Sequence, residues 1–381
     1  LVCMEQEQEV ALNLQRLAAG EKNFVGASLV AADLRGANLV EVDFSGADLR
    51  RANLSGANMQ GSRLVGAKLR EAHLMGTNLV GANLQQADFK CAFMFKALLN
   101  DADLEQANLA VAYLRGARFT AANLKGVIGE SAFLEEAVLR YANLTLADFN
   151  HAFLSKTDFS YANLTESILT DTKLVAADLT LAQLDRANLF KAKLTSSQLR
   201  GASLIEANLA YADIQATDLS NANLQNANLN QCLIDGANLT STNFQGTIYE
   251  NLGINHSCLL FPNQKIYKWK TMRFRSRTEI KVAQVLENRG LMYLPNSLMR
   301  LGRYHKSFEP DFLVCCPTAK GFKWAILEID GYWHLPQKRA KEHERERLFE
   351  HSGVRIHRFD ADLCENDPET VVSELIELMS Q

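Results

Sequence analysis

The chain has 381 residues, a formal net charge of −4 at pH 7 and 7 cysteines. Its length suits about two domains, and no segment has the run of about 20 apolar residues that a membrane-spanning helix requires. Because the cysteine count is odd and no C-x-x-C pair occurs, the sequence argues against a disulfide framework and a zinc site. This cysteine usage fits a reducing cytoplasm, so a cytoplasmic location is expected. No signal peptide is expected, because acidic residues interrupt the apolar start.

Residues 1–23 are predicted to form an N-terminal helical cap. Helix-forming residues run from residue 7 to residue 19, and Gly20 follows them as a helix stop. The repeats that begin at Phe24 would otherwise expose unpaired backbone groups at their first edge. A polar helix would cover that edge.

From Phe24 to Tyr249 a bulky apolar residue returns at every fifth position, with Gly129 as the one exception. A small residue, usually alanine, stands two places before it, and Asn or Asp often lies between them, so the unit reads A-(D/N)-L-x-x. A period of five fits neither the helix period of about 3.6 nor the strand period of about 2. Short fixed repeats form solenoids, whose units bury their apolar faces by stacking. The bulky and the small residue are therefore expected to point inward.

This pattern resembles the pentapeptide repeat family over residues 24–250. The resemblance implies a β-solenoid, in the form of a right-handed quadrilateral β-helix with four pentapeptides, or about twenty residues, in each coil. Some members of the family are acidic rods that mimic DNA and occupy topoisomerases. Acidic and basic residues are interspersed along this repeat, which weakens the mimicry interpretation.

Gly129 replaces the bulky residue in its unit. A missing side chain leaves a void or lets the wall bend, so a local kink is expected there. A functional notch is the alternative.

Steps of twenty residues align four aromatic side chains in one outward column, at positions where Asn or Asp is usual: Phe93, Tyr113, Phe133 and Phe153. Two interpretations remain open. The rings stack on one another and seal one face, or they form a contact patch for a partner protein or a second copy of the chain.

Residues 251–276 are predicted to be a basic linker. Its cations, with the first cation of the next segment, include Lys268, Lys270, Arg273, Arg275 and Arg277. Aromatic residues alternate with them, and this mixture suits phosphate contacts together with base or sugar packing. Nucleic-acid binding is therefore predicted, with DNA favoured over RNA. A solvated linker face is the alternative.

Residues 277–381 abandon the repeat and are predicted to form a small α/β domain. Helices are expected at 277–288, 336–351 and 368–379, and strands at 308–316, 323–329 and 354–359. Carboxylates gather at the strand ends. Asp311 opens one strand and Glu328 closes its antiparallel neighbour, so the two should meet. Hard carboxylate oxygens suit Mg²⁺, which can activate water and polarise a phosphodiester. Alternatively, these carboxylates form structural ion pairs and bind no metal.

Pro310-Asp311 followed by Glu328-x-Asp330 resembles the PD-(D/E)XK nuclease superfamily. Residues 328–334 (EIDGYWH) are similar to endonuclease-like domains related to the very short patch repair endonucleases. Further spaced matches to that family are Glu342, Arg345, Phe349 and Gly353. The resemblance implies a restriction-endonuclease-like domain over residues 277–380.

The resemblance also implies roles for individual residues. Asp311 and Glu328 would bind Mg²⁺ or Mn²⁺, and Glu279 would complete the site from its helix. Asp330 stands where the superfamily usually has lysine, so His334 is the best substitute as general base or transition-state donor.

Two basic residues of the predicted helix 336–351 are assigned to the same site. Lys338 is a candidate relocated lysine, and Arg345 would brace the site or contact phosphate. Alternatively, His334 is a structural histidine and Asp330 marks a degenerate, inactive site.

The sequence thus favours a metal-dependent endodeoxyribonuclease that hydrolyses phosphodiester bonds, with the repeat as a rigid spacer and protein-docking module. The alternative is a non-enzymatic protein-interaction scaffold, or an inhibitor of a DNA enzyme, with a degenerate nuclease-like domain.

Overall fold

The computed structural model describes residues 2–248, 267–269, 272–274, 276–295, 299–300, 307–308, 310–318, 321–330 and 354–380. The chain divides into two compact units, Leu1–Leu209 and Ala210–Gln381. In the described part of the chain, no helix combines the length and the apolar character needed to cross a membrane.

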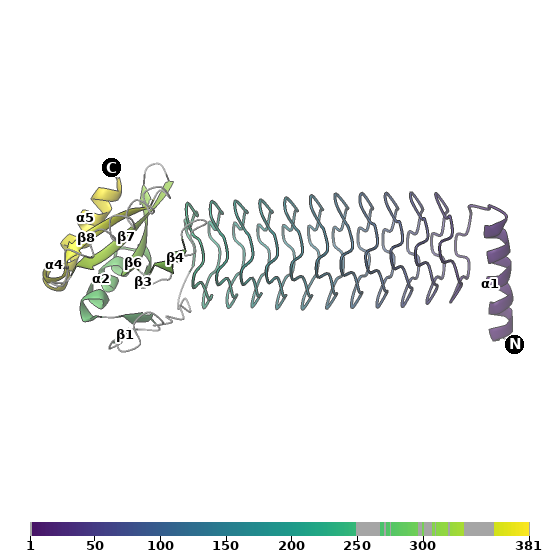
Figure 1. Cartoon of the computed structure of the whole chain (residues 1–381), viewed down its shortest axis with the longest axis horizontal. Helices are drawn as coiled ribbons and strands as arrows, with labels where there is room; N and C mark the ends of the chain where they lie inside the picture. Colours follow the sequence, from purple (N-terminus) through teal and green to yellow (C-terminus); the bar gives the residue numbers. More distant parts are fainter. Residues whose placement is uncertain are drawn as a thin grey trace. The chain divides into compact units, whose positions relative to one another are not determined.

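The first unit begins with helix α1, Val2–Ala18, which is followed by Gly20 at a positive φ of 85°. The helix lies against the first coil of the repeat (Figure 1). The buried Asn13 side chain donates from Nδ2 to the carbonyl of Ser28 at 2.9 Å, and the Arg16 guanidinium lies 5.0 Å from the centre of the Phe24 ring. The hydrogen bond satisfies a backbone carbonyl at the edge of the first coil and the Arg16 side chain covers its first ring, as expected for the cap of a repeat structure.

Parallel backbone pairing at intervals of twenty residues builds the coils, as between Asn53 and His73. Each coil therefore holds four pentapeptides, and the coil length expected from the family resemblance is confirmed. The coils of the first unit form a stack (Figure 1). Stacking buries the bulky positions and most of the small ones, as at Leu114 and Ala112, which have an exposed fraction of 0%. Thr77 fits at a small position because its hydroxyl donates to the carbonyl of Leu54 at 2.8 Å.

The preference for Asn or Asp before the bulky residue has a local cause. The side-chain oxygen accepts a hydrogen bond from the backbone N–H two residues later, as from Ser45 to Asp43 (2.9 Å) and from Thr145 to Asn143 (3.2 Å). This Asx turn supports the corner of the coil. The corner residue itself is left-handed, as at Arg51 with a φ of 61°.

The kink expected at Gly129 is absent. Backbone hydrogen bonds continue through this position, from Gly129 N–H to Asp148 (2.6 Å) and from Ala132 N–H to Gly129 (3.0 Å). A Cβ atom at Gly129 would overlap the ring of Phe149, which lies one coil further along the same interior column. The larger Phe149 side chain fills the space left by the missing leucine, so neither a void nor a notch forms.

The repeat continues in the second unit, where pairings run from Asp213 with Leu233 to Asn228 with Ile248. Beyond them, the described helices are α2 (Arg277–Asn288), α4 (Ala361–Asn366) and α5 (Pro368–Ser380). The described strands are β1 (Tyr267–Trp269), β2 (Met272–Phe274), β3 (Met292–Pro295), β4 (Met299–Arg300), β5 (Ser307–Phe308), β6 (Phe312–Thr318), β7 (Gly321–Asp330) and β8 (Arg355–Asp360).

The main sheet has the order β3-β6-β7-β8, in which β7 and β8 are parallel and the other pairs are antiparallel. The sequence located α2, α5 and the strands β6, β7 and β8, with shifts of a few residues at their ends. It missed α4 and the short strands β1 to β5, of which β1 and β2 lie within the predicted linker 251–276. The predicted helix 336–351 lies outside the described residues. The C-terminal region is thus a small α/β structure.

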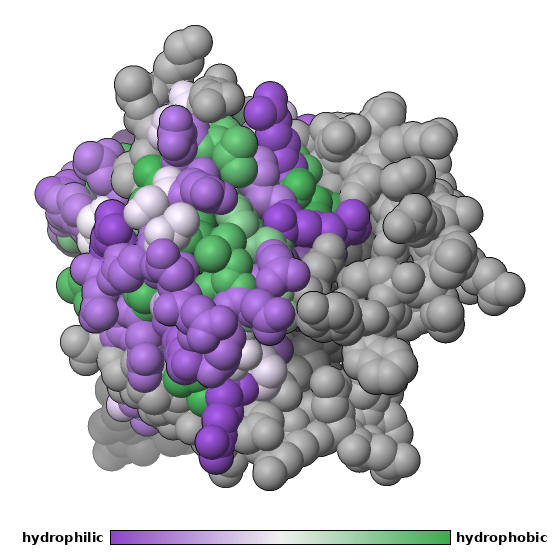
Figure 2. All heavy atoms as spheres, turned by 90° about the vertical axis from the view of Figure 1, so that its left-hand side faces the viewer, coloured by the Kyte–Doolittle hydropathy of each residue, from purple (hydrophilic) through white to green (hydrophobic). Residues whose placement is uncertain are grey.

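Helices α2, α4 and α5 cover one face of this sheet (Figure 1). Alternate strand residues, such as Val314, Leu327 and Phe359, point into the core beneath them. The other face carries Trp324 and Ile326, which are also buried. The Trp324 ring meets the ring of Phe244 edge-on, with centroids 5.3 Å apart and planes at 81°. On the side of the molecule shown in Figure 2, most of the coloured residues are hydrophilic, and small hydrophobic patches lie between them.

Candidate functional site

The structure brings the two motifs of the predicted metal site, Pro310-Asp311 and Glu328-x-Asp330, close together. Asp311 precedes β6, and its Oδ2 accepts a hydrogen bond from the N–H of Ile329 at 2.6 Å. The β6–β7 register pairs Phe312 with Leu327, so Asp311 arrives beside the strand end that carries Glu328. The antiparallel pairing expected from the sequence therefore exists.

The predicted metal-binding carboxylates have other partners in this arrangement. Glu328 forms an ion pair with Arg358 of β8, with Nε and Oε2 3.3 Å apart, and only 14% of its side chain is exposed. Glu279 is buried and belongs to the N-terminal cap of α2. Its N–H donates to Ser276 Oγ at 3.0 Å, and that hydroxyl donates back to Glu279 Oε1 at 3.2 Å.

The described part of the chain holds only some of the residues of the predicted metal site. Within the described residues, no group of three or more His, Cys, Asp or Glu side chains is placed to hold a metal ion. Asp330 closes β7, where its backbone pairs with Asp360. His334 lies outside the described residues. The metal-binding roles therefore stay predictions.

The predicted nucleic-acid residues are described only in part. Lys268 and Arg273 are directly paired in the β1–β2 hairpin, and Arg277 is exposed at the start of α2. The remaining predicted residues, Lys270, Arg275, Lys338 and Arg345, lie outside the described part of the chain.

The four aromatic residues that the sequence aligns in one column form one continuous stack, which we call the aromatic ladder: Phe93, Tyr113, Phe133 and Phe153. Their ring centroids are 4.8–5.1 Å apart and their planes are within 14° of parallel. Each contact of this kind contributes about 0.5–1.5 kcal/mol beyond burial. The ladder thus stabilises its own face, as the first of the two interpretations required.

Polar side chains close both ends of the aromatic ladder. The His73 ring stacks on Phe93 at 4.9 Å, and the Lys173 ammonium lies 4.2 Å from the centre of the Phe153 ring. The four rings are half-buried, so their edges remain accessible. A shallow groove of about 440 Å³ runs beside Phe93 and Tyr113.

Two features were not anticipated from the sequence. One is a second exposed apolar column at a corner of the first unit, where Tyr141 stacks on Tyr161 at 4.9 Å and Leu181 follows. Steps of twenty residues would have revealed it. The other is a basic cavity in the second unit, lined by Lys323, Arg355 and His357 among others. The alternation Arg355-x-His357 was a signal for it, but the sequence did not show what faces these side chains.

Solved structures with similar coils come from several sources. HetL, a pentapeptide repeat protein involved in heterocyst differentiation regulation from the cyanobacterium Nostoc sp. strain PCC 7120, is 33% identical over 62% of this chain and 92% of its own, with a TM-score of 0.30. QnrB1, a plasmid-mediated fluoroquinolone resistance protein, is 21% identical over 50% of this chain and 91% of its own, with a TM-score of 0.34. Rfr23 from the cyanobacterium Cyanothece 51142 is 30% identical over 27% of this chain and 61% of its own, with a TM-score of 0.16.

A search of curated protein sequences gave no match. The family model for pentapeptide repeats matches residues 27–64, 52–90, 97–128, 130–155, 142–180, 182–221 and 217–248. These segments make up more than half of the chain and coincide with the observed coils. The chain therefore belongs to the pentapeptide repeat family.

Proposed function

We propose that this protein is a protein-interaction scaffold that binds a partner protein through the aromatic ladder. The observation that carries this proposal is the ladder itself: four parallel rings, half-buried, held on backbone that pairs coil to coil. Aromatic residues are enriched in protein interfaces and supply much of their binding energy. Rings that are already ordered lose little conformational freedom when a partner binds.

The ladder also replaces a local stabilising device. At other coils the Asn or Asp in this position accepts the N–H two residues later, as Asp43 does for Ser45. A phenyl ring cannot accept this hydrogen bond in the same way. Four successive coils give up the Asx turn at this position and present apolar surface instead, which suits a surface selected for contact.

The proposal is tested with Phe133→Asn, which restores the residue type usual at this position and so preserves the coil. The control is Val138→Asn, a half-buried apolar residue at the same repeat position on the next side of the coil. Sedimentation and quantitative pull-down should show that Phe133→Asn loses a partner or self-association while Val138→Asn retains it. Identical profiles for wild type and Phe133→Asn would contradict the proposal.

A metal-dependent endonuclease acting on DNA is the second candidate. It is favoured by the hydrogen bond between Ile329 N–H and Asp311, which holds the two motifs of the nuclease resemblance side by side. The ion pair of Glu328 with Arg358 stands against it, since this pair would have to open before Glu328 could bind a cation.

Supercoiled plasmid with Mg²⁺ or Mn²⁺ tests this second candidate. Wild type should nick the plasmid, Asp311→Asn and Glu328→Gln should not, and the exposed control Asp362→Asn should behave like wild type. If wild type leaves every DNA intact, the endonuclease is excluded under these conditions. Inhibition of a topoisomerase without cleavage would instead favour the inhibitor alternative.

A further inference from the structure

We infer that the second unit binds a small molecule carrying a phosphate monoester, in the basic cavity at the start of β8. The cavity has a volume of about 630 Å³, within the range of small-molecule sites. Lys323, Arg355 and His357 supply its polar lining, and Leu378 and Met379 of α5 supply apolar surface. We call it the basic cavity.

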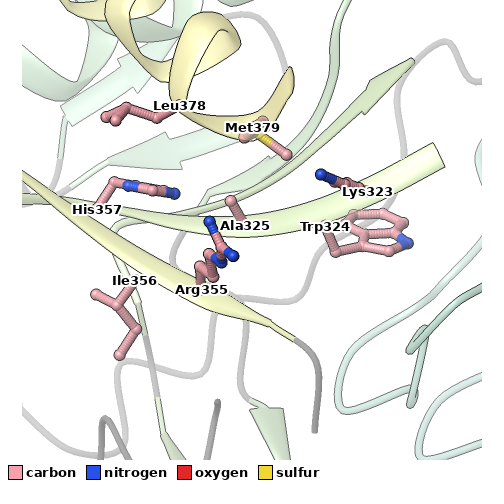
Figure 3. Close-up of a pocket in the computed structure, with 8 residues that line it drawn as sticks. All are labelled: Lys323, Trp324, Ala325, Arg355, Ile356, His357, Leu378 and Met379. Atoms are coloured by element: carbon pink, nitrogen blue, oxygen red, sulfur yellow. The ribbon is translucent and has the colours of Figure 1, made fainter. Parts of the chain in front are cut away.

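The sheet register places the polar groups together. Strands β7 and β8 are parallel, with Ala325 opposite Arg355 and Leu327 opposite His357. Because side chains alternate along a strand, Lys323, Arg355 and His357 share the face that carries α5. Figure 3 shows Arg355 and His357 on the side of β8 toward the last turn of α5, and Ile356 on the opposite side.

The positive charge of the basic cavity favours a doubly charged anionic ligand. Lys323 and Arg355 are exposed cations, and no acidic side chain is among the described residues that line the cavity. The C-terminus of α5 supplies about half a negative charge, which is too little to balance two cations. A phosphate monoester carries about −1.5 to −2 at pH 7 and three acceptor oxygens, whereas a single carboxylate would leave positive charge over.

His357 completes the polar lining as an uncharged group. Burial, assisted by the neighbouring Arg355, lowers the pKa of His357. At neutral pH the imidazole is therefore neutral and offers one N–H donor. Its Nε2 is buried, with no hydrogen-bond partner among the described residues. Turning the imidazole toward a bound phosphate oxygen would therefore break no hydrogen bond of Nε2 and would satisfy this group.

The basic cavity is separate from the other candidate sites. Lys323 lies near the start of β7, whereas Glu328 and Asp330 lie at its end. Loss of phosphate binding and loss of nuclease or scaffold function can therefore be distinguished by different variants.

Isothermal titration of the full chain with phenyl phosphate, at fixed ionic strength, tests the inference. Phenyl phosphate should bind more tightly than inorganic phosphate, because its ring reaches Leu378 and Met379. Arg355→Gln and Lys323→Gln should each weaken binding about tenfold or more, the usual effect of losing a charged hydrogen bond. Arg289→Gln is the matched control, since it removes a cation of the same unit that pairs with Glu369 away from the cavity.

Leu378→Glu provides a test that removes no cation. Leu378 is 38% exposed, so the new carboxylate should enter the cavity without disturbing the core and abolish binding. The inference fails if wild type does not bind phenyl phosphate, or if Arg355→Gln and Arg289→Gln weaken it equally. A competition experiment with a short DNA oligonucleotide without terminal phosphates tests whether the cavity binds a nucleic-acid backbone instead. If the oligonucleotide competes at the same site as strongly as phenyl phosphate, the ligand is a nucleic-acid backbone and the small-molecule assignment is wrong.

Discussion

The coils and the α/β structure obtain their order from contacts of different range. In the coils, backbone partners lie about twenty positions apart, as in Asn53 with His73. In the α/β structure, the Lys281 side chain bonds to Glu365 from 84 positions away. A coil therefore depends on its two neighbours, whereas the sheet and helices share one core.

A matched pair of core truncations should separate these two kinds of order. Leu114→Ala in a coil and Leu327→Ala in β7 both remove a fully buried side chain, and each should cost about 2–5 kcal/mol. Hydrogen exchange should increase only in the coils adjacent to Leu114, but over the whole core beneath α2 and α5 for Leu327. Equal acceleration from residue 24 to residue 209 in Leu114→Ala would show that the coils unfold as one block.

Gly129→Ala tests whether packing between neighbouring coils is specific. The added methyl group would overlap the Phe149 ring, and overpacking of this kind typically costs about 1–3 kcal/mol. Denaturant unfolding should show that Phe149→Leu rescues Gly129→Ala, because it clears the space. Additive destabilisation in the double variant would refute the compensation between these two residues.

Ser276→Ala tests local order at the start of α2. The variant removes the hydroxyl that binds both the N–H and the carboxylate of Glu279, and loss of such a cap costs about 1 kcal/mol. Ser276→Asp, which can still cap, should retain most of the stability in the same unfolding experiment. If Ser276→Ala is neutral, Glu279 is not held by the cap and its assignment to the metal site gains weight.

The smallest expected effect is electrostatic and confined to one corner of a coil. Hydrogen bonds from the Arg35 side chain and backbone lower the pKa of Asp33 to about 2. Ionised Asp33 therefore favours the folded state. This contribution is complete above the unfolded pKa of about 3.9 and is lost as the pH falls through about 2. Arg35→Gln removes the guanidinium and keeps the backbone N–H, so carboxyl NMR titration should show a higher pKa for Asp33 than in wild type. An unchanged pKa would contradict the assigned cause.

Much of the coil architecture could be predicted without coordinates. The five-residue period placed the inward residues, such as Leu114 and Ala112, and aligned the aromatic ladder. This worked because each contact in a coil is set by a fixed step along the chain. The same reasoning failed at Gly129, since filling its space depends on the size of a side chain in the next coil.

The α/β region was predicted less completely. Apolar periodicity found α2, α5 and the strands β6 to β8, and the paired motifs correctly placed Asp311 beside the strand of Glu328. The short strand β3 carried too few residues to be recognised. Glu279 takes part in a helix cap, and Glu328 forms an ion pair with Arg358. The local sequence pattern around each glutamate does not identify these partners.

The repeat pattern was sufficient to identify the family, the twenty-residue coil and the aromatic ladder, because a strict repeat relates position in the chain directly to position in space. Two arrangements could be recognised only in the folded chain: the compensation of Gly129 by Phe149, and the cavity shared by Lys323, Arg355 and His357. These arrangements arise where strands distant in sequence are paired, and the register of that pairing is fixed by the packing of the whole core.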